Sequence, residues 1–127
     1  LDRFKEVNDA FGHQVGDEVL KCVVDVLRRE LRSEDIVARY GGEEFAVIAL
    51  AANAETGCEL AERLRRRLEE ASMPAGVSRM TITVGVAATS AMSSATLAQL
   101  IAGADEALYR GKQAGRNRVE VYRPIEV

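Results

Sequence analysis

The sequence has few of the residues from which metal centres and disulfide scaffolds are built. It contains one histidine and two cysteines, Cys22 and Cys58. No Cys or His residues have the spacing of a zinc site. Both cysteines fall among apolar positions of predicted helices, which favours buried thiols over a disulfide or a ligand pair. The lone histidine, His13, follows a glycine, and we interpret it as a residue that fixes a loop rather than one that takes part in catalysis.

Long apolar runs and an excess of basic charge are also missing. No stretch approaches the roughly 20 apolar residues of a membrane span, and no signal peptide is visible. The net charge is −3, from 17 basic and 20 acidic residues, which argues against a general affinity for nucleic acid. These absences favour a cytoplasmic domain without membrane contact, and they leave open a membrane anchor elsewhere in a parent protein.

What is present is enough apolar material for one folded domain. Hydrophobic residues make up 47% of the chain, which is too many for a disordered segment. A chain of 127 residues can bury a core, and it contains no repeats or linkers. We therefore predict a single domain over residues 1–127. Because the chain starts without Met, at what resembles the tail of an apolar strand, we interpret it as a fragment.

Hydrophobic periodicity predicts helices interleaved with strands. Apolar residues recur at helical spacing in some segments, and β-branched or alternating runs occupy others. The predicted helices are 4–11, 17–32, 54–71 and 97–113, the predicted strands are 36–40, 45–50, 81–87 and 119–122, and the main loops are 73–76 and 88–94. Asn53 resembles an N-cap, and Gly115 ends the last helix. The pattern favours an α/β sandwich with helices packed on a sheet.

The most informative motif is Gly41-Gly42-Glu43-Glu44-Phe45, between two predicted strands. Two glycines permit a tight turn with positive φ and leave room for a ligand close to the backbone. Because neighbouring strand residues face opposite sides, Glu43 and Glu44 should diverge. That arrangement suits one metal ligand and one residue with another role. A solvated hairpin tip is the alternative.

This motif and two further blocks resemble the GGDEF family, in its GGEEF form. The opening block is Phe4-Lys5-x-x-Asn8-Asp9-x-x-Gly12-His13-x-x-Gly16-Asp17, and the closing block is Ala104-Asp105-Glu106-Ala107-Leu108-Tyr109 followed by Lys112-x-x-Gly115-Arg116-Asn117. Their order and spacing fit nearly the whole chain. The resemblance implies a diguanylate cyclase, which converts two GTP to cyclic di-GMP and two pyrophosphates. It also implies a homodimer and an upstream sensory domain in the parent protein.

The same resemblance implies a nucleotidyl-cyclase-like α+β fold, with a mixed central sheet around an antiparallel hairpin and flanking helices. In that family the first strand precedes the point where this sequence begins. We therefore expect this chain to lack the family's N-terminal helix and most of the first strand. The alternative function for such a fragment is a non-catalytic module that binds cyclic di-GMP or GTP.

For the chemistry, the resemblance implies Mg²⁺ or Mn²⁺ as cofactor. Phosphoryl transfer depends on charge neutralisation by such ions, which prefer oxygen ligands. Glu43 and the backbone carbonyl of Leu1 would bind the ion, beside an aspartate two positions before Asp2. Glu44 would assist a metal ion or the attacking hydroxyl, and Gly42 completes the catalytic turn. Without that aspartate, we expect the fragment to bind metal poorly and to be inactive or weakly active.

For the substrate, the resemblance implies that Asn8 and Asp17 bind guanine, whose N–H donors match a carboxylate. Alternatively, Asp17 is a helix N-cap and Asn8 an ordinary surface residue. Lys5, Lys112 and Arg116 match the triphosphate ligands, and their donors stay charged. The alternative for the last two is that they offset a helix dipole.

A second site is implied by Arg32-Ser33-Glu34-Asp35, an R-x-x-D motif five residues before Gly41. In the family this spacing marks the inhibitory site for product, with Arg32 and Asp35 as ligands. Arg63 falls where a supporting arginine from the neighbouring helix is expected. Arg32 can form a fork of hydrogen bonds to guanine or a phosphate. A five-residue strand spans roughly 17 Å, so this site lies far from the hairpin tip.

Overall fold

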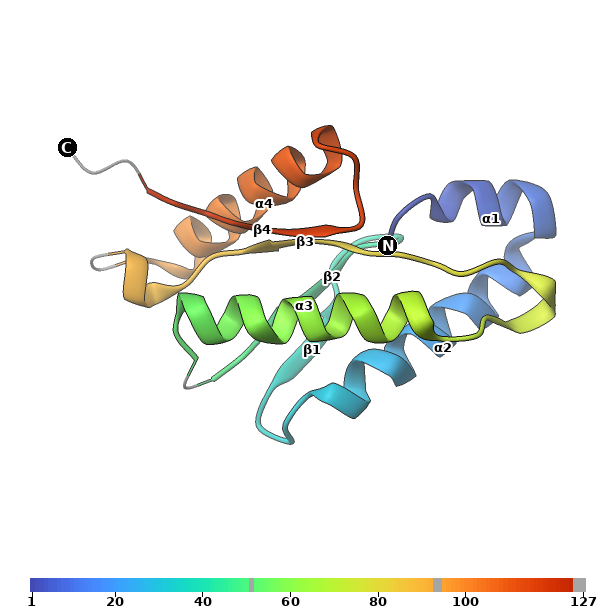
Figure 1. The fold of residues 1–127 in the computed structure, drawn as a ribbon, viewed down its shortest axis with the longest axis horizontal. Coiled ribbons are helices and arrows are strands. Elements are labelled where there is room, and N and C mark those ends of the chain that lie inside the picture. The colour runs from blue at the N-terminus through green and yellow to red at the C-terminus, as the bar shows by residue number, and fades with distance from the viewer. Residues whose placement is uncertain (51, 93–94, 125–127) are drawn as a thin grey trace.

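The computed structural model describes residues 1–50, 52–92 and 95–124. Helices and strands alternate along the chain, as the periodicity predicts (Figure 1). The elements are α1 (Phe4–Phe11), α2 (His13–Glu30), β1 (Ile36–Arg39), β2 (Phe45–Ile48), α3 (Ala54–Glu70), η1 (Pro74–Gly76), β3 (Thr83–Val86), η2 (Thr89–Ala91), α4 (Leu97–Gln113) and β4 (Arg118–Val121). Residues 93 and 94 of the predicted loop 88–94 lie outside the described residues.

The largest boundary error of the sequence prediction is at the start of α2. The helix begins at His13 rather than at residue 17. Gly12 ends α1 with a φ of 88°, a conformation that suits glycine. Its carbonyl then accepts a hydrogen bond from the N–H of Gly16 at 3.1 Å, so the next helix starts at once. His13 is exposed and forms no side-chain hydrogen bond in the described part of the chain, which does not support a loop-fixing role.

The predicted hairpin and flanking helices are confirmed, but the strands form two separate pairs instead of one continuous sheet. β1 and β2 are antiparallel, with Ile36 opposite Ile48. β3 and β4 are parallel, with Thr83 opposite Arg118. The first two residues of the chain connect the pairs: the Leu1 amine donates to the Glu43 carbonyl at 3.1 Å, and the Asp2 N–H donates to the Thr81 carbonyl at 2.9 Å.

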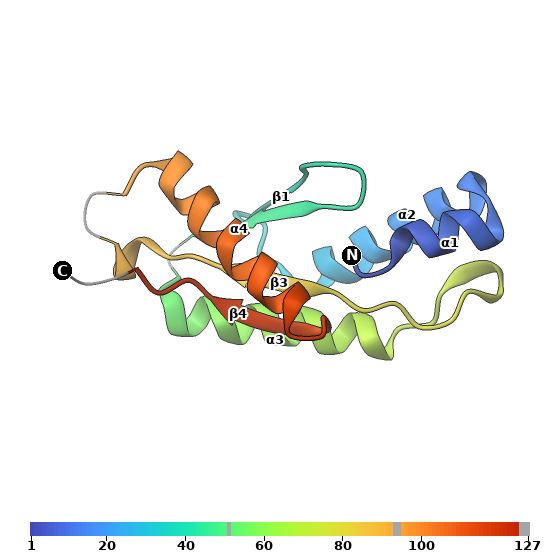
Figure 2. The ribbon, with the colours of Figure 1, turned by 90° about the horizontal axis from the view of Figure 1, so that it is seen from above.

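The β3–β4 pair lies between α4 and α3, whereas the β1–β2 hairpin stands to one side (Figures 1 and 2). α4 packs closely on β3 because Gly85 has no side chain. A Cβ atom built on Gly85 would lie 2.1 Å from the Ala104 carbonyl oxygen of α4. Glycine at this strand position therefore permits the close helix–strand contact.

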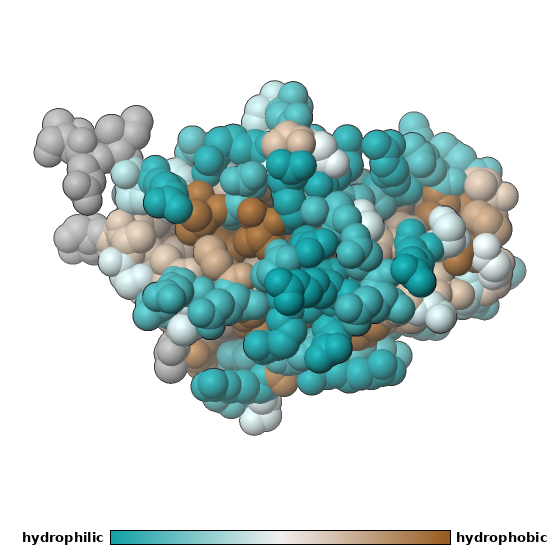
Figure 3. Space-filling view, in the orientation of Figure 1, coloured by the Kyte–Doolittle hydropathy of each residue, from teal (hydrophilic) through white to brown (hydrophobic). Residues whose placement is uncertain are grey.

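The core lies mainly between α2 and α3. Val19 and Val23 of α2 and Leu68 of α3 are its largest fully buried side chains. The outer side of α3 is hydrophilic and occupies the centre of the face in Figure 3. Cys22 and Cys58 are free thiols, as predicted, although both are half-buried rather than buried. No helix in the described ranges has the length and apolar character needed to cross a bilayer.

Candidate functional site

The tip of the β1–β2 hairpin is an open five-residue turn. The N–H groups of Tyr40 and Gly41 donate to the Glu44 carbonyl at 2.8 and 3.2 Å. The two glycines of this turn do not use the positive φ that glycine permits, because among the described glycines only Gly12, Gly76 and Gly115 have it. A turn of this length does not need the left-handed geometry of a two-residue hairpin. A Cβ atom on Gly42 would meet nothing within 4 Å, so ligands can approach this backbone closely.

Arg39, which the sequence analysis missed, holds this turn from one side. Its Nη2 donates to the Gly42 carbonyl at 2.7 Å, and its Nε lies 3.1 Å from the same oxygen and 3.2 Å from the Gly41 carbonyl oxygen. No motif singled out this residue, because one arginine at the end of a predicted strand is a common feature. The guanidinium donates to carbonyls of the turn and forms no hydrogen bond with the side chain of Glu43 or Glu44.

Residues predicted to bind metal and phosphate converge beside this turn. The Glu44 carboxylate lies 4.0 Å from the Lys112 ammonium at the end of α4. The backbone of Glu43 accepts the hydrogen bond from Leu1. Three separate parts of the sequence therefore meet at this end of the molecule.

Asp2 is close in sequence to this convergence, but its carboxylate is committed to the fold. It is buried and only 7% exposed. The hydroxyls of Thr81 and Thr83 donate to it at 2.8 and 2.7 Å, and the N–H of Asn117 donates to it at 3.1 Å. These donors occupy both of its oxygens, so Asp2 is a structural acceptor and not an available metal ligand.

The donor set at the hairpin tip is too small for a magnesium site on its own. Within the described ranges, no group of three or more His, Cys, Asp or Glu side chains could hold a metal ion. Glu43 offers one exposed carboxylate, and Glu44 is paired with Lys112. Magnesium prefers an octahedron of oxygen ligands. The residues described here do not complete that set, and no reaction step through a metal follows from them.

The two predicted guanine ligands lie at the junction of α1 and α2. Asn8 is half-buried, and its side chain lies against Gly16, because a Cβ atom there would come 1.9 Å from Asn8 Oδ1. Asp17 follows Gly16 and is exposed. Since α2 begins at His13, Asp17 lies in its second turn and is not an N-cap. The structure thus excludes the N-cap role of Asp17. It places Asn8 against Gly16, the residue that precedes Asp17.

The predicted phosphate ligands come from three different segments. Lys5 is exposed on the first turn of α1, and Lys112 lies in the last turn of α4. Arg116 follows α4 in a turn with left-handed backbone, with φ of 64° at Arg116 and 48° at Asn117. The Arg116 N–H donates to the Gly111 carbonyl at 3.0 Å. The turn therefore has a defined shape despite two non-glycine residues with positive φ.

Asn117 anchors this turn to α3. Its Oδ1 accepts a hydrogen bond from Arg65 Nη1 at 3.0 Å, and its side-chain amide donates to Glu69. Arg65 in turn donates to Glu62 at 2.9 Å. This hydrogen bond is the main cause that lowers the pKa of Glu62 and raises that of Arg65. A chain of charged contacts thus runs along α3 to the turn that carries Arg116.

The R-x-x-D motif forms a closed turn between α2 and β1, at the other end of the hairpin from its tip (Figure 1). The Arg32 N–H donates to the Asp35 carboxylate at 2.9 Å, and the Leu50 N–H donates to its other oxygen at 3.3 Å. Arg32 and Asp35 line one shallow hollow, whereas Arg63 lines another over α3. The Arg63 guanidinium is paired with Glu30 at 3.0 Å.

Comparison with known proteins places these observations in one family. The profile of the diguanylate cyclase GGDEF domain matches residues 1–118. Diguanylate cyclase DgcP of Pseudomonas aeruginosa is 41% identical over 121 residues, which cover 95% of this chain and 18% of that protein. DgcZ of Escherichia coli is 40% identical over 118 residues, covering 93% and 40%. The chain thus spans less than half the length of these curated relatives.

Solved structures show the same similarity in three dimensions. The active GGEEF domain of a diguanylate cyclase from Vibrio cholerae superposes with a TM-score of 0.90 at 33% identity, over 98% of this chain and 79% of that chain. The GGDEF domain of DgcB from Caulobacter crescentus, in complex with c-di-GMP, has a TM-score of 0.89 at 32% identity, over 97% and 72%.

Proposed function

The chain belongs to the GGDEF family of diguanylate cyclases, and from this we propose that it is the GTP-binding and product-binding part of an enzyme that converts two GTP to cyclic di-GMP and two pyrophosphates. The convergence of the hairpin tip, the first residue and the end of α4 carries this proposal. Glu44 and Lys112 lie 4.0 Å apart there, although 68 positions separate them in the sequence. A cluster that contains both a carboxylate and an ammonium group suits a metal-bound triphosphate.

In this proposal Asn8 and Asp17 bind guanine, and Lys5, Lys112 and Arg116 bind the triphosphate. Asp17 is exposed, so its carboxylate can accept from the guanine N1–H and amine. Adenine lacks this donor pattern, so ATP would leave the acceptors unpaired. The left-handed turn fixes the backbone of Arg116. This favours a defined contact of Arg116 with the triphosphate over a general offset of the helix dipole.

Catalysis by the longer protein would require a divalent cation, Mg²⁺ or Mn²⁺, held by Glu43 and the Leu1 carbonyl together with the expected aspartate before Asp2. The ion would neutralise charge on the reacting phosphate. The residues of this chain bind and orient the nucleotide: Glu44 balances Lys112, and the open backbone at Gly42 lets the phosphates approach. A homodimer would bring two nucleotides together, and an upstream sensory domain would control its formation.

We further propose that Arg32, Asp35 and Arg63 form a product site that gives feedback inhibition. The similarity to the DgcB domain in complex with c-di-GMP supports binding of this ligand. The second candidate function is a binding module without turnover. It is favoured by the commitment of the Asp2 carboxylate to Thr81, Thr83 and Asn117, so that this carboxylate is not available as a metal ligand beside Glu43.

Calorimetric titration of this chain with cyclic di-GMP, beside a GTP turnover assay, tests the proposal. We expect binding that is lost in Arg32→Ala, and no more than weak turnover. Exposed Arg29, in the last turn of α2, provides the matched control Arg29→Ala. Binding that survives Arg32→Ala would remove the product site. Strong turnover by the chain alone would show that its own residues suffice for catalysis.

A second test uses the longer protein, where Glu43→Ala should abolish turnover because one metal ligand is lost. Glu59→Ala, an exposed glutamate on α3, is the matched control and should leave turnover unchanged. Retained cyclase activity in Glu43→Ala would remove the metal assignment and, with it, the catalytic role of the hairpin tip.

A further inference from the structure

One carboxylate at the end of α2 holds two arginines of α3. Glu30 is the last residue of α2 and lies two positions before Arg32. Its Oε2 accepts a hydrogen bond from Arg63 Nε at 3.0 Å, and its Oε1 accepts one from Arg67 Nε at 3.1 Å. Its backbone carbonyl also accepts from Arg63 Nη2 at 3.4 Å. Glu30 therefore bridges the two helices beside the proposed product site.

The bridge occupies the Nε/Nη2 edge of Arg63, one of the two paired-donor edges with which a guanidinium can bind a ligand. A guanidinium recognises a phosphate or the O6/N7 edge of guanine through two parallel N–H donors. In Arg63 the Nε and Nη2 donors both point to Glu30. The Glu30 side chain is 21% exposed against 48% for Arg63, so the carboxylate is the more shielded partner. Arg63 must leave this partner before it can offer that edge to another anion.

The position of Arg63 supports the same point. Arg63 lines the hollow over α3 together with Arg66 and Arg67, whereas Arg32 and Asp35 line a different hollow between α2 and β1. Among the described residues, Glu30 is the one carboxylate within 4.0 Å of the Arg63 guanidinium. The arginine expected to complete the product site is thus paired with a single acidic residue and lines a different hollow from the other two ligands.

We infer that Glu30 competes with cyclic di-GMP for Arg63 and thereby sets the affinity of the product site. The inference rests on the proposed product site at Arg32, Asp35 and Arg63. The ligand carries two phosphodiester anions, and binding would exchange the Glu30 contact for a contact of Arg63 with the ligand. This exchange lowers the affinity for product, so that inhibition starts at a higher product concentration.

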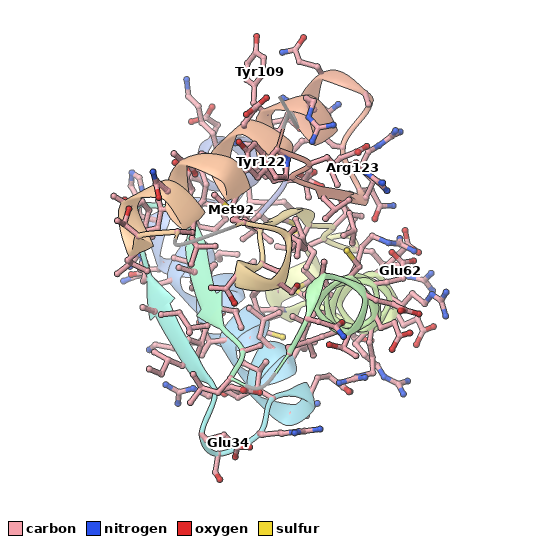
Figure 4. The ribbon with its side chains drawn as sticks, turned by 90° about the vertical axis from the view of Figure 1, so that its left-hand side faces the viewer. Glu34, Glu62, Met92, Tyr109, Tyr122 and Arg123 are labelled. Carbon is pink, nitrogen blue, oxygen red and sulfur yellow. The ribbon has the colours of Figure 1, made fainter. Side chains whose placement is uncertain are left out.

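The test is a titration of cyclic di-GMP into Glu30→Gln, which keeps the size of the side chain and removes its charge. We expect the dissociation constant to fall about fivefold, the size of one exposed ion pair. The gain should shrink as salt is raised, because salt screens such pairs. Glu34→Gln is the matched control. Glu34 lies in the R-x-x-D turn and points away from the body of the molecule (Figure 4). Its carboxylate accepts a hydrogen bond from Ser33 and forms no ion pair with Arg63 or Arg67.

A double substitution separates release of Arg63 from a simple change of net charge. In an Arg63→Ala background, Glu30→Gln should bring no further gain in affinity, because the competing partner is gone. A gain that persists there, or an equal gain in Glu34→Gln, would overturn the inference. So would weaker binding by Glu30→Gln, which would mean that Glu30 orients Arg63 for the ligand.

Thermal unfolding of each variant distinguishes these outcomes from loss of fold. If the folded wild type and the folded Glu30→Gln variant both fail to bind, the product-site proposal itself is wrong and the inference falls with it. If the wild type binds with Arg32-dependent affinity and Glu30→Gln binds no more tightly, the product site stands and only the role of Glu30 is wrong. Binding by Glu30→Gln alone would support the inference in its strongest form.

Discussion

Two turns carry the proposed phosphate chemistry, and they are built in opposite ways. The hairpin tip 40–44 is held by two backbone hydrogen bonds and the guanidinium of Arg39, and its acidic side chains lie at the surface. The turn that carries Arg116 has strained left-handed residues, and it is fixed through Asn117 by β3, α3 and the first residues of the chain.

The difference indicates which part of the site the fold orders by itself. Partly buried, charge-assisted hydrogen bonds define the turn of Arg116 without any ligand. The hairpin tip has open space at Gly42 and an exposed Glu43, so its acidic groups can adjust to a bound cation and nucleotide. The backbone that carries Arg116 is therefore preformed, whereas the acidic groups of the hairpin tip are only loosely held.

Removing Asp2, the buried acceptor that binds the turn of Arg116, should give the largest loss of stability. In Asp2→Ala, two threonine hydroxyls and the Asn117 N–H lose a buried charged acceptor. We expect the free energy of unfolding to fall by about 3 kcal/mol, as measured by urea denaturation. Asp9→Ala, an exposed aspartate on α1, should change it by less than about 0.5 kcal/mol. Equal losses in the two variants would show that the turn is not held through Asp2.

Substitution of Asn117 should have a smaller effect that divides into two parts. Asn117→Ala loses the contacts with Arg65 and Glu69 and places alanine at a φ of 48°. We expect a loss of about 2 kcal/mol, because left-handed backbone is costly for alanine. Asn117→Gly loses the same contacts without that strain, so its loss should be about 1 kcal/mol. If alanine and glycine give the same unfolding free energy, backbone strain does not contribute.

The hairpin tip should tolerate substitution better. Arg39→Ala removes the donors to the Gly41 and Gly42 carbonyls, which are exposed and can bind water instead. We expect less than about 1 kcal/mol of lost stability, with faster hydrogen exchange at the Tyr40 and Gly41 amides. Unchanged exchange at those amides would mean that Arg39 does not order the tip, and that the two turns differ less than their contacts indicate.

The smallest expected effect is an acid-dependent one at Glu62, the far end of the chain of contacts to Asn117. The hydrogen bond from Arg65 lowers the pKa of Glu62 below its ordinary value of 4.5. The pair therefore stabilises the fold above pH 4.5, and this stability is lost as pH falls through the lowered folded pKa. We expect a few tenths of a kcal/mol, because the pair is partly exposed to solvent.

Urea denaturation of the wild type and Glu62→Gln as a function of pH checks this effect. The difference in unfolding free energy should be constant at neutral pH and should vanish in acid. A difference that does not change between neutral and acidic pH would contradict the role of the ionised pair.

Local sequence signals were sufficient for most secondary structure. Helices 4–11 and 97–113 have the predicted bounds, and α3 ends one residue earlier than expected. Their apolar stripes and the capping residue Asn53 act within a few positions of the chain. The start of α2 was mispredicted because residues 13–16 have no continuous apolar stripe. That first turn is defined by Gly12 and by the packing of Asn8 against Gly16.

For the site, the sequence by itself determined which residues are candidates, through the order and spacing of the Gly-Gly-Glu-Glu-Phe motif and its flanking blocks. Only the tertiary structure decided what each of them contacts. The commitment of Asp2 to Thr83 and Asn117, and of Arg63 to Glu30, joins residues between 33 and 115 positions apart. Hydrogen bonds of this kind depend on how helices and strands pack, and the periodicity of a local segment contains no record of its distant partner.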